Sequence, residues 1–122
     1  MLKAGRWPAA LMWNAAVVLA GCFAMAWLVA RALSQSITID EADTYLSFVA
    51  PDWPSYWYPS NNNHVLNSIL MRLFIWLFGL SQLSVRGPAL IGAAIYIVAA
   101  YRLCKMIAAG SHLLLPLFVC FV

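Results

Sequence analysis

The chain has 122 residues, of which 65% are hydrophobic and only 9% are charged, and its mean hydropathy is +0.84. A soluble domain carries about 25% charged residues, so this composition excludes an ordinary water-soluble domain and indicates an integral membrane protein. The net charge of +3 is spread over seven basic residues that form no continuous run. Because no basic run is available to contact phosphates, we expect no nucleic-acid partner.

Residues 1–33 are expected to form a first membrane span that follows a short N-terminal segment. The uncharged run over residues 7–30 has 24 residues, more than the roughly 7–15 of a signal-peptide core. At about 1.5 Å per residue this run can cross a hydrocarbon layer of about 30 Å. It therefore predicts a retained membrane anchor rather than a cleaved signal.

Residues 34–63 are expected to form a loop, which holds all four acidic residues of the chain. Thr38 is followed three residues later by Glu41, the pattern of a capping box at the start of a helix. Apolar residues then recur at helical spacing as far as Pro51, which would end the helix. The loop is therefore expected to contain a short amphipathic helix that lies along the membrane interface.

Residues 64–122 are expected to hold the remaining spans. Apolar segments at residues 64–80 and 88–107 predict spans two and three, and the ten apolar residues at 113–122 predict a truncated fourth, because a full span needs about 20 residues. The expected fold class is all-α, with polytopic membrane helices. The basic residues divide equally between the two sides of this arrangement, so the positive-inside rule leaves the orientation open.

The acidic group of Asp40, Glu41 and Asp43 has two interpretations. Carboxylates in the first turn of a helix are stabilised by the helix dipole by about 0.3–1 kcal/mol each, so all three can serve only to start the helix. Alternatively, one of them accepts a proton from an acceptor hydroxyl at the membrane surface. Residue types alone favour the structural interpretation and leave the catalytic one open.

A second polar cluster begins with Asn63 and His64 at the start of the predicted second span. Asparagine caps helices well, but such a cluster also suits the binding of a sugar or a diphosphate. His64 with Asp40 or Asp43 would offer nitrogen and oxygen ligands to a divalent cation. The spacing is not a metal motif, so a divalent cation stays a possible cofactor and no metal ligand is assigned.

Arg72 and Trp57 each have two interpretations as well. A cation inside a predicted span is costly unless it reaches the interface or finds a partner, so Arg72 either snorkels to the membrane surface or holds a lipid phosphate. Trp57 belongs to an aromatic segment at residues 53–58. It either rests at the headgroup level with the other aromatics or stacks on a sugar ring.

The order of these features is more informative than any single residue. One span is followed by the pair Asp40–Glu41, then by an interfacial loop, a polar start to the next apolar segment, and the connection FGLSQLSVRGP at residues 78–88. This order resembles the N-terminal portion of the GT-C class of membrane glycosyltransferases. The resemblance covers roughly residues 37–105 and is nearest to the protein O-mannosyltransferase and aminoarabinose-transferase group, which uses polyprenyl-phosphate sugars.

The resemblance implies that Asp40 is the catalytic base, which deprotonates an acceptor hydroxyl for inverting attack on the sugar, and that Glu41 orients groups within the site. It also implies a short cytoplasmic N-terminus before the first span, an extracytoplasmic loop over residues 34–63 and a cytoplasmic Arg86. The candidate substrate-binding residues are Asp43, Trp57, Asn63, His64 and Arg72.

The expected partners are a polyprenyl-phosphate-sugar donor, membrane lipids and an unidentified acceptor. Enzymes of this class have more membrane helices than this sequence, so the chain alone is expected to be catalytically incomplete. The alternative is a small non-catalytic membrane protein with several spans, such as an assembly subunit or a transporter fragment.

Overall fold

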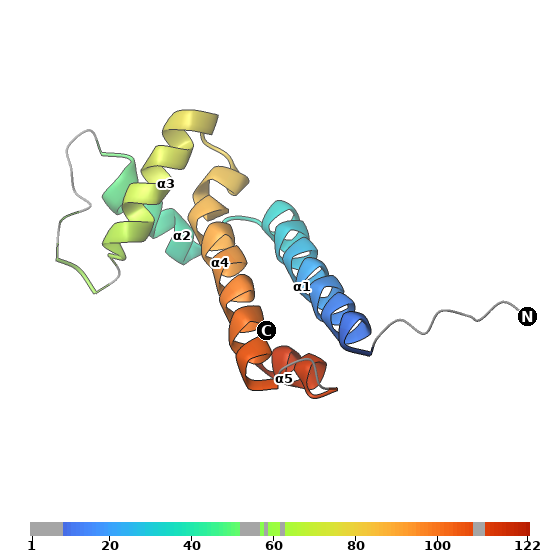
Figure 1. The fold of residues 1–122 in the computed structure, drawn as a ribbon. Coiled ribbons are helices and arrows are strands. Elements are labelled where there is room, and N and C mark those ends of the chain that lie inside the picture. The colour runs from blue at the N-terminus through green and yellow to red at the C-terminus, as the bar shows by residue number, and fades with distance from the viewer. Residues whose placement is uncertain (1–8, 52–56, 58, 62, 109–111) are drawn as a thin grey trace, which may run out of the picture. The chain divides into compact units, whose positions relative to one another are not determined.

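The computed structural model describes residues 9–51, 57, 59–61, 63–108 and 112–122. These residues form helices without any strand (Figure 1), which confirms the expected all-helical class. In chain order the elements are α1 (Ala9–Ser34), α2 (Ile39–Thr44), the π-helical turn η1 (Tyr45–Val49), α3 (Val65–Phe78), α4 (Gln82–Ala108) and α5 (Leu114–Phe121). The chain divides into two compact units, Met1–Trp27 with Ala93–Val122 and Leu28–Gly92, and each is described by itself.

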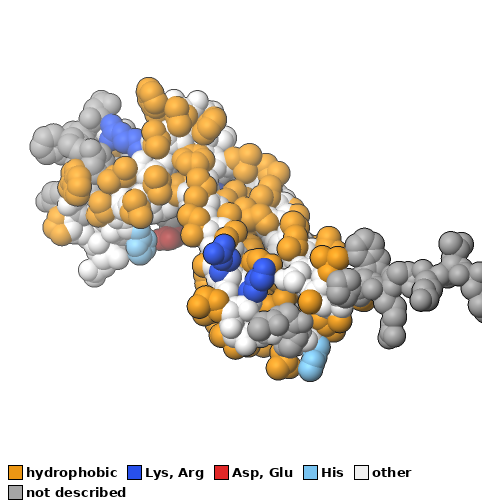
Figure 2. Space-filling view, in the orientation of Figure 1, with side chains coloured by type: hydrophobic (Ala, Val, Ile, Leu, Met, Phe, Trp, Pro, Cys, Tyr) orange, Lys and Arg blue, Asp and Glu red, His pale blue; other side chains and the backbone are white. Residues whose placement is uncertain are grey.

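Two of the described helices are long and apolar enough to cross a membrane, α1 with 26 residues and α4 with 27. Hydrophobic side chains also cover most of the face seen in Figure 2. The second span expected at residues 64–80 is not confirmed. Helix α3 occupies this segment but has only 14 residues, a length of about 21 Å, whereas a spanning helix needs about 20 residues.

The third expected span lies within α4, but this helix begins at Gln82 rather than near Pro88. The backbone N–H of Ser84 donates to Oγ of Ser81 at 3.1 Å, and a side-chain acceptor of this kind starts a helix. Pro88 consequently lies inside α4, close to its start, where the helix loses a single backbone hydrogen bond. The truncated fourth segment forms α5, which has eight residues.

In the unit that contains α5, this short helix packs against the first part of α1 and the second part of α4. The buried core residues are Val17, Ala100, Cys104, Ala108, Leu114 and Phe118. Polar groups in this unit are paired: the hydroxyl of Tyr101 donates to Oδ1 of Asn14 at 3.1 Å, and that of Tyr96 donates to the carbonyl of Phe121 at 2.6 Å. Such pairing limits the cost of placing polar groups in an apolar environment.

In the second unit, α2 continues without a break into η1, and η1 packs along α3. Residues 39–49 are thus helical, whereas the amphipathic helix at a membrane interface that we expected there stays a prediction. Within this segment the side chains of Thr44, Phe48 and Val49 are buried, while those of Leu46 and Ser47 are exposed. Val49 joins Met71 of α3 and Val85 of α4 in a small apolar core, which fixes these three elements together.

The connection from α3 to α4 depends on glycine. Gly79 ends α3 with a φ of 77°, a left-handed conformation that favours glycine. Further on, Gly87 lies so close to α3 that an added Cβ atom would overlap the ring of Phe74. These two positions allow the chain to reverse direction and α4 to approach α3.

Candidate functional site

Arg86 and Glu41 form a two-point ion pair in the Leu28–Gly92 unit. Nε of Arg86 donates to Oε1 of Glu41 at 2.7 Å, and Nη2 donates to Oε2 at 2.8 Å. The Arg86 side chain is 10% exposed and that of Glu41 is 25% exposed. Parallel bonds of this kind are among the stronger polar contacts in proteins, so the pair joins α2 firmly to α4.

The remaining hydrogens of Arg86 point at the C-terminal end of α1. Nη1 donates to the carbonyl oxygens of Ala32 at 2.9 Å and Gln35 at 2.8 Å, and Nη2 donates to that of Ser36 at 2.8 Å. The last carbonyls of a helix lack partners within the helix and carry partial negative charge. Arg86 therefore satisfies the end of α1 while it holds α2, and all five of its N–H groups are used.

Glu41 takes part in a second set of bonds at the start of α2. Its Oε2 accepts from the backbone N–H of Thr38 at 2.8 Å, and its own N–H donates to Oγ1 of Thr38 at 3.3 Å. The capping box expected from the sequence is thus confirmed. The side-chain hydrogen bond from Arg86, aided by the one from Thr38, lowers the pKa of Glu41 from 4.5 to about 2. At neutral pH this carboxylate is ionised and its oxygens are already bonded.

Asp40 precedes Glu41 in the first turn of α2, and its environment is different. It is exposed to solvent, and within the described part of the chain no hydrogen bond or ion pair engages its carboxylate. Asp43 lies one turn further, is also exposed, and accepts from the hydroxyl of Ser47 at 3.1 Å. Of the adjacent pair, Asp40 is the carboxylate that is open to an incoming group.

In the second polar cluster, which begins with Asn63 and His64, the hydrogen bond of Asn63 stabilises the start of α3. Oδ1 of Asn63 accepts from the hydroxyl of Ser68, which is fully buried, at 3.2 Å. His64 stands at the N-cap position of α3 without a side-chain capping bond and is exposed. No hydrogen bond or ion pair among the described residues joins His64 to Asp40. The described residues also contain no group of three His, Cys, Asp or Glu side chains that could hold a metal ion.

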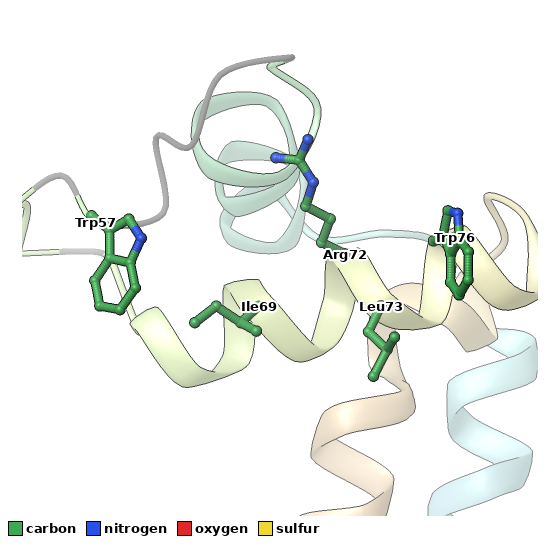
Figure 3. Close-up of a pocket in the computed structure, with 5 residues that line it drawn as sticks. All are labelled: Trp57, Ile69, Arg72, Leu73 and Trp76. Atoms are coloured by element: carbon green, nitrogen blue, oxygen red, sulfur yellow. The ribbon is translucent and has the colours of Figure 1, made fainter.

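Arg72 and Trp57 both line an open hollow on α3. The hollow has a volume of about 370 Å³ and is lined by Trp57, Ile69, Arg72, Leu73 and Trp76. Figure 3 shows Arg72 on one side of α3, with Leu73 extending from the other. Nη1 of Arg72 donates to the carbonyl of Pro51 at 3.3 Å. The lining of the hollow combines one guanidinium group, two indole rings and two aliphatic side chains. This set of groups suits an amphipathic ligand. The other aromatics of the 53–58 segment lie outside the described residues.

The site residue that sequence reasoning placed wrongly is Arg86. We expected it on the cytoplasmic side, opposite the loop that contains Glu41, but the two side chains are bonded to each other. The physical reason is the length of α3, which is too short to carry the chain across a membrane before α4 begins. The sequence did contain a signal. Gly79 marks the end of one helix, so Arg86 falls near the start of the next, and a buried arginine there needs an anionic partner.

The comparisons with known proteins do not identify the chain. No protein-family model, curated protein or solved structure matches it.

Proposed function

We propose that this chain carries the acidic acceptor site of a membrane glycosyltransferase, which transfers a sugar from a polyprenyl-phosphate carrier to an acceptor hydroxyl. The supporting observation is the division of roles within the Asp40–Glu41 pair. Arg86 binds Glu41 and thereby fixes the first turn of α2, while the neighbouring Asp40 remains exposed. A fixed helix end that presents a carboxylate without a partner among the described residues is suited to general-base catalysis.

In the proposed reaction, Asp40 accepts the proton of the acceptor hydroxyl. The acceptor oxygen then forms a bond to the anomeric carbon of the sugar from the face opposite the lipid. The bond between that carbon and the lipid phosphate breaks, and the phosphate leaves with the electron pair. This displacement inverts the anomeric configuration.

The hollow on α3 is the proposed place for the donor. The guanidinium of Arg72 suits a phosphate group, the aliphatic side chains of Ile69 and Leu73 suit a prenyl chain, and the exposed indole of Trp57 suits a sugar face. Asp43, Asn63 and His64 belong to the same unit and keep their predicted roles as polar contacts to the substrate. The resemblance to GT-C enzymes implies that further membrane helices complete the site.

The proposed location is a cell membrane, with α2 and α3 on the extracytoplasmic side. Two candidate spans support the membrane location. The extracytoplasmic side is where GT-C enzymes of this group meet their polyprenyl-linked donors.

Substitution of Asp40 by asparagine tests the proposal. In membranes that contain the full-length protein, Asp40→Asn should reduce sugar transfer from labelled polyprenyl-phosphate sugars by about 10²-fold or more, because the amide cannot accept the proton. The abundance of the protein should be unchanged, since Asp40 is exposed and no hydrogen bond or ion pair within the described ranges engages its carboxylate.

Thr38→Ala is the matched control, because it removes the cap of the same helix and leaves Asp40 in place. It should cost about 1 kcal/mol of local stability and leave transfer measurable. If Asp40→Asn and Thr38→Ala change transfer only in proportion to protein abundance, the acidic group serves the helix alone. The chain would then fit the alternative of a non-catalytic membrane protein.

A further inference from the structure

Helix α3 presents an apolar face that nothing in the described part of the chain covers. Its opposite face packs on Val49 of η1 and Val85 of α4 through the buried Met71 and the half-buried Ile75, and Ser68 on the same face is fully buried. On the outer face the exposed fractions are 71% for Leu66, 45% for Leu73, 78% for Trp76 and 54% for Leu77. A helix that buries a serine and exposes this series of large apolar residues is arranged for a non-aqueous neighbour.

The position of α3 relative to the ends of the two candidate spans indicates what covers its apolar outer face. Arg86 joins the start of α4 to the C-terminal end of α1, so both of these helix ends lie at one level. Met71, in the middle of α3, packs on Val85, the residue that precedes Arg86. The centre of α3 therefore lies at the level where α1 ends and α4 begins, which is the boundary of the bilayer if these helices span it.

From these observations we infer that α3 docks on the bilayer surface as an interfacial helix, with its outer face in the acyl region of the lipids. Its length of about 21 Å does not allow it to span. Its single charged residue, Arg72, lies half-buried beside the hollow, at the level where a guanidinium can reach lipid phosphates. Trp76 is of the residue type that prefers the interface. The inference rests on the two spans and not on sugar transfer.

The depth of spin labels in the bilayer tests this inference. Leu66, Leu73 and Leu77 lie seven and four residues apart on the exposed face, and each is replaced singly by cysteine in the full chain. The chain is reconstituted into phosphatidylcholine–phosphatidylglycerol vesicles, after its native Cys22, Cys104 and Cys120 are changed to alanine. If the Cys104→Ala background does not fold, a spin-labelled non-natural amino acid at the same positions keeps the native cysteines. Accessibility to oxygen and to a water-soluble nickel complex then gives the depth of each label.

An interfacial α3 places all three labels within the lipid at depths that differ by less than about 8 Å, which corresponds to a tilt below about 30° from the membrane plane. A spanning α3 would separate the first and last labels by about 16 Å in depth. A larger difference than about 8 Å, or nickel access at all three positions, overturns the inference.

Helix α1 supplies a matched control with the same spacing. Met12, Leu19 and Phe23 are all exposed, and labels at these positions should differ in depth by about 16 Å between the first and the last. This gradient demonstrates that the measurement distinguishes a spanning helix from a surface helix in the same protein.

Discussion

Arg86 can be buried in this apolar chain because every N–H group of its guanidinium has a hydrogen-bond partner. These groups donate to the carboxylate of Glu41 and to backbone carbonyls at the C-terminal end of α1. Removal of one partner from a buried pair leaves the other charge without compensation and costs about 3–5 kcal/mol. Since the Glu41 side chain is 25% exposed, we expect the lower end of this range for Glu41→Gln.

The lowered pKa of Glu41 predicts a specific dependence of stability on pH. A carboxylate with a pKa near 2 in the folded state and 4.5 when unfolded stabilises the protein above pH 4.5, and this contribution is lost as the pH falls toward 2. Thermal unfolding in detergent should therefore separate wild type from Glu41→Gln clearly at pH 7 and much less at pH 3. An equal separation at both pH values would contradict the ion pair.

At the level of the helices, the contact between α3 and α4 depends on the missing side chain of Gly87. An added Cβ would overlap the ring of Phe74, and crowding of this kind costs about 1–3 kcal/mol. Gly87→Ala should lower the unfolding temperature, and Phe74→Leu in the same chain should restore part of the loss. Gly92→Ala is the control, since its added Cβ would meet no described atom within 4 Å other than its chain neighbours and the backbone of its own helix. It should be neutral or slightly stabilising, and an equal loss at both glycines would refute the close approach.

The sequence predicts those features whose interacting residues lie close together along the chain, and it misses those whose residues are far apart along it. The helix that starts at Thr38 was predictable because its capping box is complete within four residues. The extent of α3 was not, because a 14-residue interfacial helix and a span share the same apolar composition. The start of α4 was missed because Pro88 suggested a first turn, whereas Ser81 provides the cap earlier. The partner of Arg86 lies 45 residues away, beyond any local pattern, and only the fold brings it to Glu41.

If α1 and α4 are the two spans of the whole molecule, the seven basic residues of the sequence divide between two sides of the membrane. In the sequence all four acidic residues fall between these two helices, as does Arg72, while Arg31 lies in the last turn of α1 and Arg86, which is paired with Glu41, lies near the start of α4. The other four basic residues lie toward the opposite ends of the two helices, at Lys3, Arg6, Arg102 and Lys105. Four basic residues on one side against three on the other fit the proposed cytoplasmic N-terminus, since the positive-inside rule counts basic residues and not net charge.

Labelling of single cysteines in intact cells measures this topology. Ile37 and Leu80 are exposed and flank the segment between the spans, so Ile37→Cys and Leu80→Cys should both react with a membrane-impermeant maleimide from outside. A third span at residues 64–80 would instead protect Leu80→Cys until the cells are permeabilised. Reaction of neither position from outside would reverse the orientation.

In the proposed function, Glu41 holds the start of α2 in place while Asp40 accepts the proton of the acceptor hydroxyl. The most direct measurement is sugar transfer per folded molecule for Asp40→Asn and Glu41→Gln, with the folded fraction determined by size-exclusion chromatography. We expect Asp40→Asn to lose about 10²-fold or more in transfer at normal yield, and Glu41→Gln to lose yield while each folded molecule stays active. Full transfer by Asp40→Asn, or an equal loss per folded molecule in both variants, would contradict this account.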